Sequence, residues 1–257
     1  MKCITIIPAR MGSSRLPGKP LADIAGTAMI VRVWRQAMSA ATGPVLVAAA
    51  QAEIVDAVRA AGGEAILTDP ALPSGTDRVF AALESVDAEG AYEVIVNLQG
   101  DLPFLDPAHL RNVEETLLRS GADLATLAAP IRDAADFDNP NVVKPVVAWS
   151  ETETRGRALY FTRARAPFGD GTLYHHIGIY AFRRMALARF VALPQSPLEK
   201  RENLEQLRAL EAGLTIAVGL VDDVPLSVDT EEDLARARGV AAAGATNIGG
   251  LRSQGES

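Results

Sequence analysis

Short apolar runs rich in β-branched residues alternate with longer segments of helical periodicity in this 257-residue chain. This alternation is typical of βαβ units and predicts an α/β fold around a mainly parallel central sheet. The expected strands cover residues 4–7, 45–48, 65–67, 93–97, 125–131, 142–148 and 215–219. The expected helices cover residues 28–41, 51–61, 77–85, 107–119, 183–193, 201–212 and 231–242.

Residues 1–243 are expected to form a single domain. The segment 155–184 differs from the rest because aromatic, cationic and small residues alternate in it, and we expect it to line a site. Residues 244–257 are rich in glycine, serine and asparagine and lack periodicity, which predicts a disordered tail.

The composition narrows the classes of partner. A net charge of −7 disfavours binding to nucleic acid or to an anionic membrane surface. No signal pattern and no apolar run of membrane-spanning length is apparent, which predicts a cytoplasmic protein. The single cysteine, Cys3, is expected to be a small buried side chain. One Cys and three His make a zinc site improbable, so any metal is expected to be a hard cation held by carboxylates.

A basic, glycine-containing loop follows the first expected strand. Gly12 and Gly18 allow tight turns, and Arg10, Arg15 and Lys19 place three cations within ten residues. This charge suits a triphosphate better than a single carboxylate. The spacing matches neither G-x-x-x-x-G-K-[ST] nor G-x-G-x-x-G. The alternative interpretation is an ordinary polar surface loop.

Two acidic positions are candidate metal ligands. Asp101 follows the strand 93–97, at the edge where open α/β sheets bind ligands. Asp229 precedes a predicted helix, and one carboxylate from each place could hold Mg²⁺ against phosphates. From periodicity alone, however, helix capping is the favoured role for Asp229.

Two further polar segments are candidate binding elements. Residues 74–78 (Ser-Gly-Thr-Asp-Arg) could bind a pyrimidine edge or a ribose, or could simply form a turn and a helix cap. Residues 160–165 and 174–180 concentrate tyrosine, histidine and arginine, which suit the hydroxyls and carboxylate of an acidic sugar. Of the adjacent pair His175 and His176, we expect His176 to face inward, because neighbouring strand residues face opposite ways.

Over residues 2–240 these segments together resemble the 3-deoxy-manno-octulosonate (Kdo) cytidylyltransferases, or CMP-Kdo synthetases, of Gram-negative bacteria. The segments that carry the resemblance are 7–20, 74–78, 97–101, 139–144, 158–164, 176–180, 197–199, 204–208 and 228–230. The opening segment is shared with other sugar nucleotidyltransferases, whereas the sugar-side segments are more specific to this family. Two positions depart from the family pattern: Leu102 stands where a Glu is usual, and Ala48-Ala49-Ala50 replaces Ala-Thr-Asp.

The resemblance implies a Rossmann-like nucleotidyltransferase fold with a smaller sugar-binding and dimerisation insertion at about 130–190, and a homodimer. It implies CTP and Kdo as substrates, Mg²⁺ at Asp101 and Asp229, and a catalytic group of Arg10, Lys19, Asp101 and Asp229. The implied nucleotide-binding residues are Ala9, Arg10, Gly12, Ser13, Arg15, Lys19, Ser74, Gly75, Arg78, Gln99 and Gly100. The implied Kdo-binding residues are Gln99, Arg163, His176, Tyr180, Glu205 and Gln206.

The implied reaction is transfer of CMP from CTP to the anomeric hydroxyl of Kdo, giving CMP-Kdo and pyrophosphate for lipopolysaccharide synthesis. Two alternatives stay open. The chain could transfer CMP to another 2-keto sugar acid, such as 8-amino-Kdo or a nonulosonic acid, or it could be a noncatalytic nucleotide-binding protein.

Overall fold

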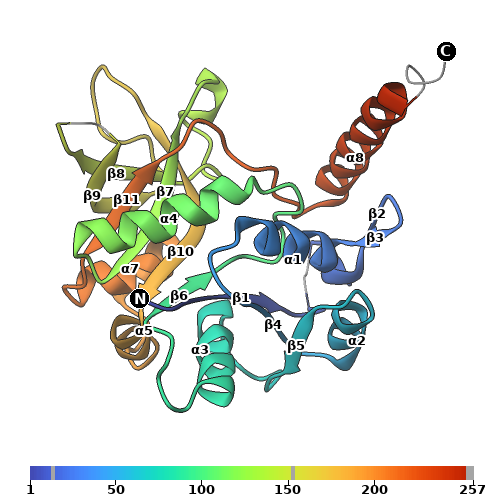
Figure 1. The fold of residues 1–257 in the computed structure, drawn as a ribbon. Helices are drawn as coiled ribbons and strands as arrows, with labels where there is room; N and C mark the ends of the chain where they lie inside the picture. The colour runs from blue at the N-terminus through green and yellow to red at the C-terminus, as the bar shows by residue number, and fades with distance from the viewer. Residues whose placement is uncertain (13–14, 152–153, 253–257) are drawn as a thin grey trace.

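The computed structural model describes residues 1–12, 15–151 and 154–252, with side-chain surroundings as far as residue 243. Its main element is a sheet of nine strands (Figure 1). The strands are β1 (Cys3–Ala9), β4 (Val45–Ala49), β5 (Glu64–Leu67), β6 (Val94–Asn97), β7 (Leu124–Pro130), β8 (Lys144–Trp149), β9 (Arg155–Thr162), β10 (Tyr174–Arg183) and β11 (Ile216–Leu220). A small hairpin of β2 (Asp23–Ile24) and β3 (Thr27–Ala28) lies outside this sheet.

The helices are α1 (Met29–Ala40), α2 (Ala52–Ala60), α3 (Gly75–Val86), α4 (Pro107–Ser120), α5 (Arg184–Val191), α6 (Pro197–Glu202), α7 (Gln206–Glu211) and α8 (Glu231–Arg252). Two short 3₁₀ turns cover Lys19–Leu21 and Ala134–Asp136. None of the helices in the described ranges is long and apolar enough to cross a bilayer.

The sheet is mixed, and its two halves differ in strand direction. The order is β5-β4-β1-β6-β10-β7-β11-β9-β8. The pairs among β5, β4, β1 and β6 are parallel, as is the pair of β7 with β11. Strand β10 runs antiparallel to both β6 and β7, and β9 runs antiparallel to both β11 and β8. The α/β class is therefore confirmed, but the expectation of a mainly parallel sheet is wrong for the second half of the chain.

The predicted insertion at 130–190 has a simple structural explanation. Its strands β8, β9 and β10 belong to the same sheet, and a direct connection of residues 163–173 joins β9 to β10. Strands β8 and β9 are antiparallel neighbours and need no helical crossover, and the connection from β9 to β10 contains no helix, so this region adds strands without adding βαβ units.

Helices cover both faces of the sheet, which gives three layers with a core on each side. One core contains buried residues of α1, α2 and α4, and the other contains buried residues of α3, α5 and α7. Typical members are Ile30, Ile54 and Leu110 on the first side and Leu83 and Phe190 on the second, all at most 2% exposed. Each such side chain contributes about 2 kcal/mol by its burial. The two cores hold the strand ends that carry the site.

Local signals in the sequence explain where several helices begin and end. The Asp106 side chain accepts a hydrogen bond from the backbone N–H of Ala108, Pro107 is the first residue of α4, and Gly121 ends this helix with φ = 68°. This combination of an acidic cap, an initial proline and a final glycine is the usual one. The predicted helix over 201–212 is instead two helices, because Asn203 adopts a left-handed conformation (φ = 54°) that ends α6.

The last helix runs away from the sheet in Figure 1. Helix α8 ends at Arg252, ten residues beyond the predicted end at Ala242, and so includes part of the segment predicted to be a disordered tail. Residues 240–243 (Val-Ala-Ala-Ala) favour this continuation, since alanine has the highest helix propensity. Residues 253–257 of the predicted tail lie outside the described residues.

Candidate active site

The basic loop after β1 is held in place by hydrogen bonds from its backbone N–H groups. The backbone N–H of Gly18 donates to the carbonyl of Met11 at 3.2 Å, and the N–H of Met11 donates to Oε1 of Gln51 at 2.8 Å. Gly18 adopts φ = 72°, which favours glycine, and it precedes the 3₁₀ turn that begins at Lys19. The loop therefore returns to the end of β1 and brings Lys19 close to Asp101.

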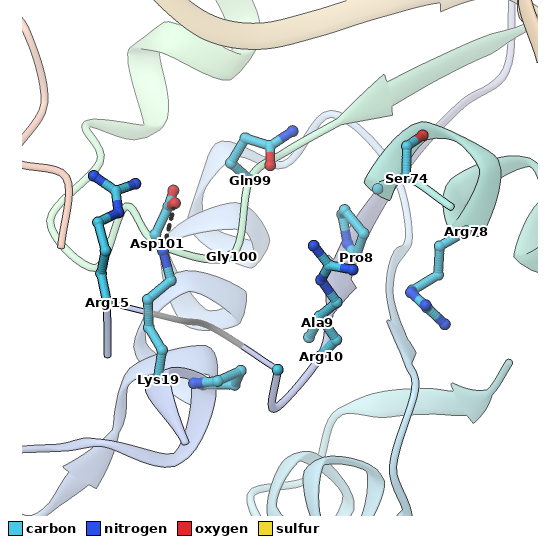
Figure 2. Close-up of a pocket in the computed structure, with 13 residues that line it drawn as sticks. Pro8, Ala9, Arg10, Arg15, Lys19, Ser74, Arg78, Gln99, Gly100 and Asp101 are labelled. Atoms are coloured by element: carbon cyan, nitrogen blue, oxygen red, sulfur yellow. Dashed lines mark hydrogen bonds and ion pairs between the residues drawn. The ribbon is translucent and has the colours of Figure 1, made fainter. Parts of the chain in front are cut away.

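A cavity of about 550 Å³ opens at the carboxyl ends of β1 and β6. Figure 2 shows Arg15, Lys19 and Asp101 on one side of it and Ser74 and Arg78 on the other. The lining residues include every predicted nucleotide-binding residue that the structure describes: Ala9, Arg10, Gly12, Arg15, Lys19, Ser74, Gly75, Arg78, Gln99 and Gly100. Ser13, the remaining predicted contact, lies outside the described residues. Segments far apart in the sequence thus form one polar, cationic cavity.

Glycine is needed where the loop after β6 crosses the end of β1. A Cβ atom on Gly100 would lie 3.2 Å from the carbonyl oxygen of Pro8 and 3.3 Å from Cδ1 of Ile30. Such contacts are tighter than ordinary packing, so a larger residue would push the loop outward. Gly100 thus allows Gln99 and Asp101 to lie next to the basic loop.

Ser74 and Arg78 have structural roles in addition to lining the cavity. The Ser74 hydroxyl accepts a hydrogen bond from the N–H of Asp77 and caps α3, so the capping interpretation of this segment is confirmed. Arg78 is only 2% exposed and donates to the carbonyl of Asp69 at 3.0 Å. Burial lowers the pKa of Arg78, and the nearby positive charge of Arg10 lowers it further.

Asp101 and Asp229 converge on the ammonium group of Lys19. Its Nζ lies 2.8 Å from Oδ2 of Asp101 and 3.0 Å from Oδ1 of Asp229. Arg15 adds a longer ion pair with Asp229, at 3.2 Å. Burial opposes the charge on Lys19, but the two carboxylates outweigh this effect and raise the pKa of the lysine. The residue therefore stays protonated.

The structure also answers whether Asp229 caps the last helix. The Thr230 hydroxyl accepts a hydrogen bond from the N–H of Asp233, while Oδ2 of Asp233 accepts from the backbone N–H groups of Asp229 and Thr230. Thr230 and Asp233 therefore satisfy the start of α8. The preference for a capping role of Asp229, based on periodicity alone, is wrong, because its carboxylate instead faces Lys19.

The donor set suits one kind of metal. The carboxylates of Asp101 and Asp229 already meet at one shared positive group, the Lys19 ammonium, which marks a point where a cation is favoured. In the described part of the chain, no cluster of three or more His, Cys, Asp or Glu residues could hold a metal. Mg²⁺ commonly uses one or two protein carboxylates and completes its shell with phosphate oxygens and water. The residues present therefore fit Mg²⁺ bound together with a nucleotide.

A second cavity of about 970 Å³ adjoins the first, and Gln99 and Asp101 line both. His175 and His176 of β10 also line it. The His176 ring packs against Phe161 and Tyr180, with ring centroids 5.0 and 5.6 Å away, and its Nε2 lies 2.9 Å from the Thr126 hydroxyl. Burial lowers the pKa of His176 to about 3, so the imidazole is neutral.

The other predicted sugar contacts lie on neighbouring elements. Tyr180 is on β10 opposite Asn97 of β6. Burial raises the pKa of Tyr180 well above its ordinary value, and the nearby Glu205 carboxylate raises it further, so the phenol keeps its proton. Glu205 and Gln206 stand at the start of α7. The structure thus brings Tyr180 and Glu205 close together, with His176 in ring contact with Tyr180.

Arg163 is placed differently. Its guanidinium donates to the backbone carbonyls of Glu202, Pro140 and Asn203 at 2.7, 2.8 and 3.3 Å. Like Tyr180, Glu205 and Gln206, it is not among the residues that line the two cavities. The arginine predicted to bind the sugar acid therefore holds the chain segment that leads to Glu205.

Three buried side chains near the site were not singled out from the sequence. Asn97 and Thr76 are 1% and 3% exposed and are hydrogen-bonded to each other, and Arg208 forms a buried ion pair with Glu199. Asn97 at a strand end and Thr76 in the polar segment 74–78 were visible signals. No local pattern in the sequence indicates which distant residues they contact.

Comparisons with known proteins agree with this geometry. Residues 4–216 match the cytidylyltransferase family model. The chain is 65% identical over 235 residues to the 3-deoxy-manno-octulosonate cytidylyltransferase of Parvibaculum lavamentivorans, covering 91% of each protein. It is 61% identical over 236 residues to the Rhodospirillum rubrum protein of the same name, covering 91% of this chain and 94% of that one. A solved structure of CMP:2-keto-3-deoxy-manno-octonic acid synthetase complexed with CTP superposes with a TM-score of 0.87 at 37% identity, covering 95% of this chain and 99% of that one.

Proposed function

This chain belongs to the 3-deoxy-manno-octulosonate cytidylyltransferase family, and on that premise we propose that its two adjoining cavities hold CTP and Kdo for one transfer reaction. The enzyme transfers CMP from CTP to the anomeric hydroxyl of Kdo and releases pyrophosphate. The product CMP-Kdo serves lipopolysaccharide synthesis. The observation that carries the proposal is the meeting of Asp101, Asp229 and Lys19 beside both cavities.

The first cavity is proposed to hold CTP. Arg10, Arg15 and Lys19 supply positive charge for the triphosphate, and the backbone at Gly12 can approach it closely. Ser74 and Arg78, on the opposite side, are proposed to contact the cytosine and ribose (Figure 2). Transfer of a nucleotidyl group depends on positioning and charge neutralisation, so Arg10 and Lys19 would stabilise the leaving pyrophosphate.

Asp101 and Asp229 are proposed to hold Mg²⁺, as the donor set suggests. When bound there, the ion would neutralise phosphate charge and make the attacking hydroxyl more acidic. Lys19 would have to leave the two carboxylates and turn toward the phosphates. The chain's own contribution is to keep the two carboxylates together and to supply the cations that surround the triphosphate.

The second cavity is proposed to hold the sugar acid together with the start of α7, which is connected to the cavity residue His176 through Tyr180, although Glu205 itself lines a separate pocket. Gln99 lies between the two cavities, and His176, Tyr180, Glu205 and Gln206 supply neutral and charged hydrogen-bonding groups. The protonated Tyr180 hydroxyl and the Glu205 carboxylate complement the hydroxyls of a sugar. We propose that Arg163 acts indirectly, by anchoring the segment before Glu205 through its three carbonyl contacts.

We also propose a homodimer in the cytoplasm, with part of 130–190 in the contact. Strand β8 is the last strand of the sheet, and its outer edge has no strand partner among the described residues. Leu159 and Phe168 in the same region are exposed. Pairing or covering such an edge is a common outcome of association. Sedimentation velocity would report the oligomeric state.

The central test is pyrophosphate release from purified protein with CTP and Mg²⁺, comparing Kdo, 8-amino-Kdo and N-acetylneuraminic acid. We expect release with Kdo that stops when EDTA removes the metal. Release with another acid only would support the proposed reaction but show that Kdo is not the substrate. CTP binding without release for all three would instead support the noncatalytic alternative.

A further inference from the structure

One hydroxyl connects the two proposed substrate sides. Thr76 is in the first turn of α3, two residues after Ser74 of the nucleotide cavity. Its hydroxyl donates to Oε2 of Glu205 at 2.6 Å, across 129 residues of sequence. Thr76 is 3% exposed and does not line the nucleotide cavity. Its side chain therefore contacts Glu205 rather than the nucleotide cavity.

The hydroxyl of Thr76 is fixed in direction by a second contact. Asn97, at the end of β6, donates from Nδ2 to Oγ1 of Thr76 at 3.2 Å. Because a hydroxyl has only one proton, accepting from Asn97 leaves the proton for Glu205. The three residues thus form a directed chain from the central sheet through α3 to the start of α7.

Unpartnered polar atoms cluster along this chain. Within the described residues, Oδ1 of Asn97, Oε1 of Glu205 and Nε2 of Gln206 are buried and have no hydrogen-bond partner. Buried polar atoms are nearly always paired in folded proteins, so an unpaired group of acceptors and a donor points to a polar ligand. A polyhydroxylated sugar acid, as proposed above, supplies both kinds of partner.

Without Thr76, Glu205 has a competing partner. Oε1 of Glu205 lies 3.8 Å from Nη2 of Arg208, whose Nε and Nη2 both donate to Glu199. Loss of the short bond from Thr76 would leave the Glu205 carboxylate free to rotate toward this cation. The carboxylate would then no longer present Oε1 to a ligand.

We propose that Thr76 is a positioning residue that sets the sugar-acid affinity of the enzyme by fixing the Glu205 carboxylate. The inference rests on the proposed function, since it assigns a role in binding the second substrate. It separates two neighbours in sequence: Ser74 lines the nucleotide cavity, whereas Thr76 does not line it and bonds to Glu205.

The test compares Thr76→Val, which keeps the shape but removes the hydroxyl, with Thr76→Ser, which keeps the hydroxyl. We expect Thr76→Val to raise the KM for Kdo about tenfold, because a hydrogen bond to a charged group is lost. The KM for CTP should change less than about twofold, with a smaller fall in kcat than in kcat/KM for Kdo. Thr76→Ser should restore most of the Kdo affinity. Calorimetric titration with CTP checks that each variant is folded.

Several results would overturn the inference. An unchanged KM for Kdo in Thr76→Val, an equal rise in the KM values of both substrates, or no rescue by Thr76→Ser would each contradict it. If Thr76→Val does not bind CTP, Thr76→Ala replaces it, and failure of both to fold would show that the hydroxyl serves stability only. Failure of the proposed function is distinguishable, because the unmodified enzyme would then show no Kdo-dependent pyrophosphate release.

Discussion

The nucleotide side and the sugar side of the molecule are built in different ways. The nucleotide side consists of loops after parallel strands, and its charged groups range from the exposed Arg15, at 63% side-chain exposure, to the buried Arg78. The sugar side consists of side chains on antiparallel β10 and on α7, and α7 is tied to α3 by the hydrogen bond from Thr76 to Glu205 and to α6 by the buried ion pair of Arg208 with Glu199. The nucleotide side can exchange its ion-pair partners when a ligand binds, whereas the side chains of the sugar side are already held in position before binding.

This difference has an energetic basis. Exposed cations are stabilised by water and lose little when a partner is removed, so the nucleotide loop can move toward a triphosphate. Buried polar groups are costly unless they are paired, so the sugar side depends on its internal partners. Substitutions should therefore separate activity from stability on the nucleotide side and combine them on the sugar side.

The largest effect is expected from Asp101→Asn. Removing one of the two carboxylates that meet at Lys19 should lower turnover at least about a hundredfold, since charge stabilisation of the transferring group is lost. CTP binding and the midpoint of urea unfolding should change little. Pyrophosphate release measures the first, and calorimetry and circular dichroism measure the others.

Asp106→Asn is the matched control for this variant. Asp106 caps α4 through a 2.7 Å bond from the N–H of Ala108, and asparagine is an equally good cap. Its turnover should equal that of the unmodified enzyme. Near-normal turnover of Asp101→Asn would exclude the proposed metal site.

A comparison of Arg208→Met with Arg15→Ala tests whether the sugar side contributes more to stability than the nucleotide side. Arg208 pairs with Glu199 where the two side chains are 8% and 6% exposed, so its loss leaves a buried carboxylate unpaired. The free energy of unfolding should fall by about 3 kcal/mol in Arg208→Met and by less than about 1 kcal/mol in Arg15→Ala. Arg15→Ala should instead weaken CTP binding. Equal losses of stability in urea titrations would show that the two sides do not differ in this way.

Lys19→Met tests the proposal that Lys19 and a metal ion compete for the same two carboxylates on the nucleotide side. Without the ammonium group between Asp101 and Asp229, a divalent cation no longer competes with the positive charge that both carboxylates share, and only the ion pair of Arg15 with Asp229 remains. Mn²⁺, used as a paramagnetic probe without nucleotide, should bind about tenfold more tightly. Turnover should fall, because the same lysine serves the phosphates. Lys2→Met removes the same charge at an exposed position and should leave Mn²⁺ affinity unchanged; an equal gain there would refute the role of Lys19.

The smallest effect concerns pH and the half-buried His176. Its pKa is lowered from 6.5 to about 3, so between these values the unfolded chain binds a proton that the folded chain does not. Stability should therefore fall as pH decreases below 6.5, by roughly 1 kcal/mol at pH 5.5 relative to pH 7. His176→Gln should lose this part of the dependence in urea titrations at the two pH values. An identical slope in both proteins would contradict the burial of a neutral imidazole.

The nucleotide side was largely predictable because each of its segments carries a local signal in the sequence. Arg10, Arg15 and Lys19 lie in one loop, and the end of β6 is marked by Gly100 and Asp101. Hydrophobic periodicity also located most helices and strands, since each buries one face.

The sugar side was less predictable because distant residues make it. No local pattern shows that β10 lies between β6 and β7, or that Thr76 bonds to Glu205. Arginine suits both a ligand carboxylate and backbone carbonyls, so residue type could not show that Arg163 uses its donors on the chain itself.

The strand order has a consequence for synthesis of the protein on the ribosome. Strand β6 is made early, yet its second neighbour is β10, and β7 has neighbours β10 and β11 that are also made later. As the chain emerges, both strands therefore have open edges until the last third has been translated. Such edges favour pairing with other chains. Premature termination before β11 would accordingly yield a fragment that aggregates rather than a smaller working enzyme.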